Sequence, residues 1–146
     1  MPEKETVERA EQDKREGKAP STQAGEFVRE EIEHIREGKH GARSTKQAIA
    51  IGLSKARRAG VDLPPPEKGE TSESTRRQAK RDLRKAGTRR KPSRKRSRAT
   101  LSALKREGRS AASKKALSRQ ARTAAAKRSK ASRSRTAKKA AATRKK

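Results

Sequence analysis

Two groups of residues in this sequence are able to do chemistry: a pair of histidines, and a large excess of lysine and arginine. The chain of 146 residues has two histidines, His34 and His40, and no cysteine. Histidine beside carboxylates can hold a metal ion, and His34 stands among Glu30, Glu31 and Glu33. However, residues six apart do not share one face of a helix. We therefore interpret His34 as a surface residue of an acidic helix, and predict no metal site and no cofactor.

The lysines and arginines are suited to ionic binding of phosphate. There are 44 of them against 17 Asp and Glu, a formal net charge of +27. Residues 1–70 hold 14 basic and 14 acidic residues, whereas residues 71–146 hold 30 basic and three acidic ones. Such a tail matches a polyanion better than any small ligand. Because it has no aromatic residue to stack on bases, duplex DNA or structured RNA is the expected partner.

The residues that we expect to contact phosphate lie between positions 76 and 128, and they are densest between 89 and 98. The predicted nucleic-acid-binding residues are Arg76, Arg77, Lys80, Arg81, Arg89, Arg90, Lys91, Arg94, Lys95, Arg96, Arg98, Lys105, Arg106, Lys114, Lys115, Arg119, Arg122, Lys127 and Arg128. The alternative is that this run of cations only keeps the chain in solution and binds nucleic acid incidentally.

Signals of catalysis and of export are missing from the sequence. Neither histidine stands in a recognisable nucleophile motif, and there is no phosphate-cradling glycine loop. We predict a protein that is not an enzyme and has no small-molecule substrate. No apolar run approaches the roughly 18 residues of a membrane span, and the N-terminus lacks the apolar stretch of a signal peptide. We therefore expect no membrane contact and a cytoplasmic, nucleoid-associated location.

The elements that must position these residues are short helices. Only 14 residues are Val, Ile, Leu or Phe, a level that with high net charge is typical of disordered chains. We predict an all-α fold class, with a marginal N-terminal helical hairpin and a C-terminal half that is largely disordered or helical only when bound. The predicted domains are a solvated charged helix in 1–20, the hairpin in 21–63, a Pro-rich polar linker in 64–74 and a polycationic tail in 75–146.

The hairpin prediction rests on two apolar stripes at helical spacing. Ser44 is placed to cap the second helix in a capping box with Gln47, and Gly60 to end it. The predicted core is Phe27, Val28, Ile32, Ile35, Ile49, Leu53 and Val61. Gly17, Gly38, Gly60, Gly87 and Gly108 are each predicted to end a helix. Burial of so few apolar side chains does not offset the conformational entropy that the hairpin loses on folding. We therefore expect a homodimer through residues 21–63 or a bound partner.

One segment carries a family resemblance. GKHGARSTKQAIAIGLSKARRAG, residues 38–60, resembles the signature of small basic bacterial proteins of unknown function. STQAGEFVREEIEHIREG, residues 21–38, and RKPSRKRSRATLSALKREG, residues 90–108, are similar to the same family. The resemblance implies no established activity. The tail from about residue 110 is also similar in composition to the Lys/Ala-rich tails of linker-histone-like proteins.

Three functional hypotheses follow. The first is a DNA-binding, nucleoid-associated-type protein whose tail binds the phosphate backbone with little sequence preference. The second is a stress-related hydrophilic protein with incidental nucleic-acid affinity. The third is a helix-turn-helix around residues 44–60, with its turn at Gly52 and a recognition helix opening at Ser54. The competing interpretation of that segment is one continuous helix in which Gly52 allows close packing.

Overall fold

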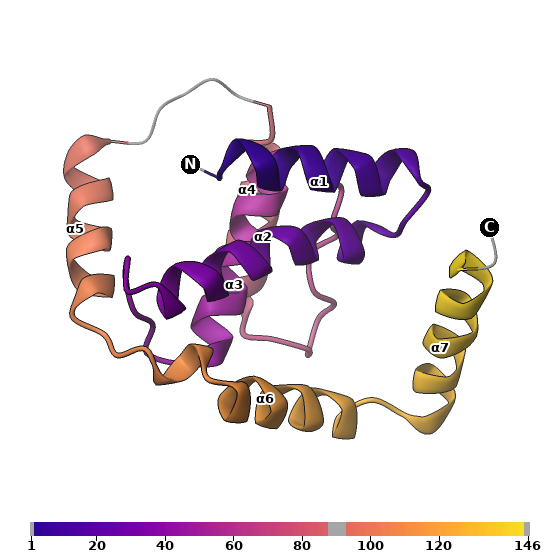
Figure 1. Cartoon of the computed structure of the whole chain (residues 1–146). Helices are drawn as coiled ribbons and strands as arrows, with labels where there is room; N and C mark the ends of the chain where they lie inside the picture. The colour runs from indigo at the N-terminus through magenta and orange to yellow at the C-terminus, as the bar shows by residue number, and fades with distance from the viewer. Residues whose placement is uncertain (1, 88–92, 145–146) are drawn as a thin grey trace.

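The structure is a computed structural model that describes residues 2–87 and 93–144, and within these ranges it contains helices and no strand (Figure 1). This confirms the all-α prediction. The elements are α1 (Lys4–Arg15), α2 (Pro20–Arg36), α3 (Thr45–Arg58), α4 (Glu73–Arg84), α5 (Arg94–Lys105), the 3-10 helix η1 (Ser110–Ala112), α6 (Lys114–Ala126) and α7 (Lys130–Arg144). None of the described helices is long and apolar enough to cross a membrane.

The helices α2 and α3 form the predicted hairpin, and its closest approach is at Gly52. A Cβ atom on Gly52 would lie 2.6 Å from the Cα of Val28, so only glycine lets the two backbones come this near. The Ser44 hydroxyl accepts a hydrogen bond from the Gln47 backbone N–H at 3.1 Å, which satisfies a free donor at the start of α3. Gly60, with φ of 105°, follows its end. Both predicted ends of α3 are confirmed.

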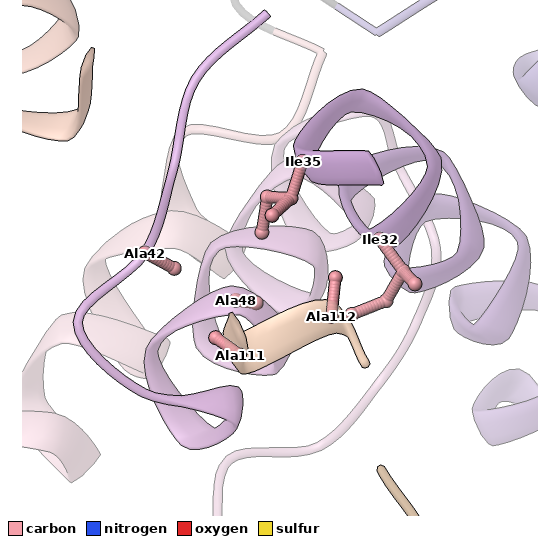
Figure 2. Packing of buried hydrophobic residues seen from close by; sticks show 6 residues of the cluster. All are labelled: Ile32, Ile35, Ala42, Ala48, Ala111 and Ala112. Atoms are coloured by element: carbon pink, nitrogen blue, oxygen red, sulfur yellow. The ribbon is translucent and has the colours of Figure 1, made fainter. Parts of the chain in front are cut away.

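Two small clusters make up the core. The Phe27 cluster contains Ala10, Ala24, Phe27, Ala56 and Val61. The alanine cluster contains Ile32, Ile35, Ala42, Ala48, Ala111 and Ala112, and Figure 2 shows α2, α3 and η1 contributing side chains to it. Four predicted core residues are buried, namely Phe27, Ile32, Ile35 and Val61.

The remaining predicted core residues are only half-buried. Val28 and Leu53 pack against the clusters, but Ile49 belongs to neither, which corrects its assignment. The reason is that small residues, Ala48, Gly52 and Ala56, form the buried stripe of α3. Small side chains at i, i+4 and i+8 permit the close helix contact, and Ile49 lies beside that stripe.

Helix α1 is not the solvated helix predicted for residues 1–20. Thr6 and Ala10 are buried, Val7 packs against the Phe27 cluster, and Arg9 donates to the carboxylate of Glu26 on α2 at 2.8 Å. Its sequence shows only Val7 and Ala10 as apolar positions, so the amphipathic signal is weak. Val7 and Ala10 nevertheless pack, because Ala24 and Phe27 of α2 lie in the same cluster.

The second half of the chain is attached to the hairpin by backbone pairing. The N–H of Gly41 donates to the Leu104 carbonyl at 2.9 Å, and that of Ala42 donates to the Gly108 carbonyl at 3.1 Å. The η1 helix then buries Ala111 and Ala112. The apolar stripe for which the sequence predicts a second copy or a partner is thus covered within the chain by α1 and η1, and dimerisation through 21–63 stays a prediction.

Helices occupy the described C-terminal half, where the sequence predicts a largely disordered chain. A serine precedes α4, α5 and α6, and in each case its hydroxyl accepts from a backbone N–H in the first turn. Alanine and arginine supply high helix propensity between the caps. Among the four α-helices of this half only α4 buries side chains, in addition to the short helix η1. Figure 1 shows α5 and α7 on opposite sides of α1–α4.

Candidate nucleic-acid interface

The orientation of α4 is set by one buried carboxylate. Asp82, 1% exposed, accepts from the Ser54 hydroxyl at 2.6 Å, from Arg58 Nε at 2.9 Å and from Gln78 Nε2 at 3.0 Å. With Asp82 turned toward α3, the opposite side of α4 presents exposed Arg77, Lys80, Arg81 and Arg84. The single acid in the last turns of α4 therefore fixes the helix rather than neutralising its outer cations.

Beyond α4 the cations have almost no acidic counterpart. Residues 93–144 contain 19 Lys and Arg and one acid, Glu107. In this segment no Lys or Arg lies within salt-bridge distance of a carboxylate. Helices α5, α6 and α7 bury none of their residues. Their charged groups are therefore solvated and available to an external anion.

The fold also gathers cations that are far apart in sequence. A groove of about 330 Å³ lies between the start of α3 and the start of α6, and Arg43, Lys115 and Arg119 line it. The hydrogen bond from Thr45 Oγ1 to the Ala111 carbonyl, 2.7 Å, holds the two segments together. Both helix N-termini carry partial positive charge, which adds to that of the three side chains. This groove therefore brings three cationic side chains and two helix N-termini to one concavity.

The N-terminal half uses its charges differently, because its cations meet carboxylates within the fold. Lys18 contacts Asp13 at 2.7 Å and Glu16 at 2.9 Å, and hydrogen bonding to Asp13 raises the pKa of the Lys18 ammonium. Lys55 is bonded to the buried Glu31. These cations stabilise local structure.

The predicted nucleic-acid-binding residues are distributed over α4, α5 and α6, and the structure keeps them at the surface. Arg76 is half-buried, with its Nε donating to the Pro66 carbonyl at 3.2 Å. The other described ones are exposed. Arg89, Arg90 and Lys91 lie outside the described residues. Sequence reasoning missed Arg43, whose place in the groove depends on a contact between residues 45 and 111 that no local pattern indicates.

The helix-turn-helix hypothesis for residues 44–60 is not supported by the geometry of α3. The helix runs without interruption through Gly52, so the required turn is replaced by a close helix contact. Its polar residues are also engaged within the chain: Ser54 and Arg58 bind Asp82, and Lys55 binds Glu31. Arg57, 7% exposed, donates to the carbonyls of Leu63 and Pro64, and burial lowers its pKa.

Part of the chain matches a known protein family. Residues 4–68 match a family described as a family of unknown function, DUF6496. The match includes the segments 21–38 and 38–60 that carry the resemblance, and it ends before the segment 90–108. No curated protein and no solved structure gives a significant match to the chain.

Proposed function

We propose that this protein binds nucleic acid, with duplex DNA as its main ligand, through the phosphate backbone and with little sequence preference. The observation that carries the proposal is the set of 19 basic residues against one acid in residues 93–144, on helices that bury none of their own residues. Cations that are not paired with carboxylates are available to neutralise phosphates and release their counterions. A nucleoid-associated location and a non-enzymatic role are parts of the same proposal.

The groove between α3 and α6 is the proposed anchor of this binding. Arg43, Lys115 and Arg119 face one concavity, so a backbone phosphate there meets three charges and two helix N-termini at once. The α5 and α7 helices extend the contact on either side (Figure 1). Phosphate contacts of this kind position a protein on the duplex without reading bases.

Binding is also proposed to stabilise the helices of the C-terminal half. Like charges at i and i+4, such as Lys115 and Arg119, oppose helix formation in water. Phosphate neutralises that repulsion. The helices seen in the structure then become more persistent on the nucleic acid, and the far-ultraviolet circular dichroism of the full chain gains helical signal when DNA is added.

The experiment is a salt titration of binding to a duplex of mixed sequence, using the full chain between 50 and 200 mM salt. If about 15 cations neutralise phosphates, the logarithm of affinity falls with a slope near −13 against the logarithm of salt concentration. The triple variant Arg43→Gln, Lys115→Gln, Arg119→Gln loses three contacts, and the slope becomes shallower by about 3.

The matched control removes the same charge elsewhere. Lys4, Lys14 and Lys68 are exposed residues of the N-terminal half, and the variant with all three changed to Gln keeps the groove. Equal losses of affinity and of salt slope in the two variants would show that net charge alone determines binding. The groove would then not be an anchor. Weak binding across the whole salt range, together with protection of a dried enzyme by the chain, would favour the stress-related hydrophilic protein instead.

A further inference from the structure

The two histidines, which the sequence places six residues apart, meet in space. Helix α2 ends at Arg36, and Gly38, with φ of 80°, turns the chain back along it. The rings of His34 and His40 then lie edge to face, with centroids 6.1 Å apart and an interplanar angle of 84°. The objection to a metal site, that positions i and i+6 point apart on one helix, does not apply because the helix has ended between them.

His40 is held in one orientation by its neighbour in the chain. Its Nδ1 lies 2.9 Å from the carbonyl oxygen of Gly41, and since a carbonyl can only accept, Nδ1 carries the proton. The other nitrogen, Nε2, faces a carboxylate oxygen of Glu31 at 3.1 Å. An unprotonated nitrogen and a carboxylate both present lone pairs, so a positive species must lie between them: either a second proton or a metal ion. A backbone carbonyl bound to the far nitrogen is the usual support of a metal-ligating histidine.

The carboxylates of this cluster are buried and not fully satisfied. Glu31 is 1% exposed, and Lys55 bonds its Oε1, which leaves Oε2 to face His40. Glu30 is 2% exposed. Its Oε1 accepts from the Glu3 backbone N–H at 2.6 Å, but its buried Oε2 has no hydrogen-bond partner, and the Lys55 ammonium is 3.8 Å from it. A buried carboxylate oxygen without a hydrogen bond is costly unless a cation is near.

We propose that Glu31, His34 and His40 form a binding site for a zinc-class divalent transition-metal ion. One donor atom from each of the three lies within 4.8 Å of the others, and Glu3, Glu30 and His34 form a second, overlapping triad with the same property. Two imidazoles with a carboxylate are a donor set that suits zinc, whereas magnesium and calcium prefer oxygen alone. Glu3 and Glu30, which share the second triad with His34, are the candidate sources of a fourth ligand, and water is the alternative.

The distances are compatible with the size of such an ion. Tetrahedral zinc, with bonds of about 2.0–2.1 Å, keeps its donors about 3.4 Å apart. The Nε2 of His40 and the Oε2 of Glu31 already stand 3.1 Å apart. The His34 side chain is 15% exposed and its Nε2 bonds Glu3 Oε1 at 2.8 Å, so ligation through Nε2 exchanges that hydrogen bond for the ion. Lys55 binds the other oxygen of Glu31 and so keeps its place when the ion enters.

The test uses the full chain freed of metal by a chelator and then titrated with zinc chloride at pH 7.5 in an isothermal calorimeter. The expected result is one ion per chain. His40→Gln, His34→Gln and Glu31→Gln each weaken binding at least about 10-fold, the lower bound seen when even an outer-shell partner of a metal is removed. Glu33→Gln is the matched control, because Glu33 is a half-exposed acid of the same helix paired with Arg29, and it leaves the affinity unchanged.

A second readout does not depend on the variants folding. Cobalt added to the metal-free wild-type chain gives intense visible absorption bands if the ion is held tetrahedrally, and zinc abolishes them stoichiometrically. Absence of one-to-one zinc binding, or His variants that bind as the wild type does, would overturn the proposal. The cation between His40 and Glu31 is then a proton, and the pair is a buried salt bridge. Magnesium binding as tight as that of zinc would also overturn the proposal, because magnesium prefers oxygen ligands to imidazole.

Discussion

The two ends of the molecule hold their charges in opposite ways. In residues 2–63, cations meet carboxylates within the fold, as Arg9 meets Glu26 at 2.8 Å and Lys18 meets Asp13 at 2.7 Å. In residues 93–144, nineteen cations have a single acid among them. The same residue types are therefore structural at one end and available for ligands at the other. What decides their role is whether a carboxylate lies within reach.

The comparison extends to how each end is stabilised. The N-terminal helices bury apolar side chains in the Phe27 cluster and the alanine cluster. Helices α5, α6 and α7 have no buried residue; α6 packs half-buried Leu117 against the alanine cluster, and the three helices rely mainly on serine caps and helix propensity. Packing energy is concentrated in the part that the family match covers, residues 4–68, and charge is concentrated in the part beyond it.

The strongest test of this contrast removes one large side chain from each end of the molecule. Phe27, 1% exposed, is the chain's one aromatic residue, whereas Leu101 is 43% exposed. Phe27→Ala should cost about 3–5 kcal/mol of unfolding free energy, and Leu101→Ala should stay within about 0.5 kcal/mol of wild type. Urea unfolding followed by circular dichroism measures both. A comparable loss in the two variants would mean that α5 is packed against the core.

A smaller effect is expected from two glycines inside helices of the hairpin. Gly52→Ala places a Cβ 2.6 Å from the Val28 backbone, and overpacking of this kind costs about 1–3 kcal/mol. Gly25→Ala is the matched control in α2, because its Cβ would meet nothing within 4 Å. It should stabilise the protein by roughly 0.5–1 kcal/mol through helix propensity. Thermal unfolding would contradict the close contact if both variants were stabilised.

The attachment of α4 is tested by removing its buried charge. Asp82→Asn takes the carboxylate away from Arg58 and Ser54, and we expect a loss of about 1–3 kcal/mol in unfolding free energy. Glu73→Gln alters a half-exposed acid of the same helix and should change stability by less than about 0.5 kcal/mol. If Asp82→Asn were equally neutral, α4 would be held by Ala79 and not by its acid.

The smallest expected effect is a change in the pKa of Glu3. The hydrogen bond with His34, 2.8 Å, and the charge of Lys39 hold the pKa of the Glu3 carboxyl below its ordinary value. The stability that this contact contributes is therefore fully present above the unfolded pKa of about 4.3. It is lost as the pH falls through the lowered pKa of the folded state. His34→Ala should raise the Glu3 pKa, and Lys39→Gln should raise it less. Carboxyl carbon NMR of metal-free protein measures both pKa values. An unchanged Glu3 pKa in His34→Ala would show that the hydrogen bond between Glu3, at the start of α1, and His34 of α2 does not form.

Local features of the fold are the ones that the sequence predicts correctly. The Ser44 cap, the end at Gly60 and the apolar stripe of α2 each depend on residues within a few positions of one another. Gly17, Gly38 and Gly87 also adopt the positive φ expected of helix ends. Gly108 does not, because its carbonyl accepts from the Ala42 N–H and the chain there is paired with another segment.

The contacts that the sequence does not predict are those between distant segments of small or polar residues. Alanine contributes little to hydrophobic periodicity, so the sequence does not indicate that Ala111 and Ala112 are buried within the basic tail. The placement of Arg43 beside Lys115 follows from that docking. The His34 and His40 pair was missed for a related reason, since a helix-face argument assumes a continuous helix, and α2 ends at Arg36.

The pairing of Gly41 and Ala42 with Leu104 and Gly108 also gives the molecule an order of assembly during synthesis. The Phe27 cluster and the side chains packed against it come from residues 7–63, so it is complete once the first part of the chain has left the ribosome. The alanine cluster needs Ala111 and Ala112, and stays open until those residues emerge. A nascent chain therefore packs its N-terminal helices first and docks the segment of Ala111 and Ala112 against them afterwards.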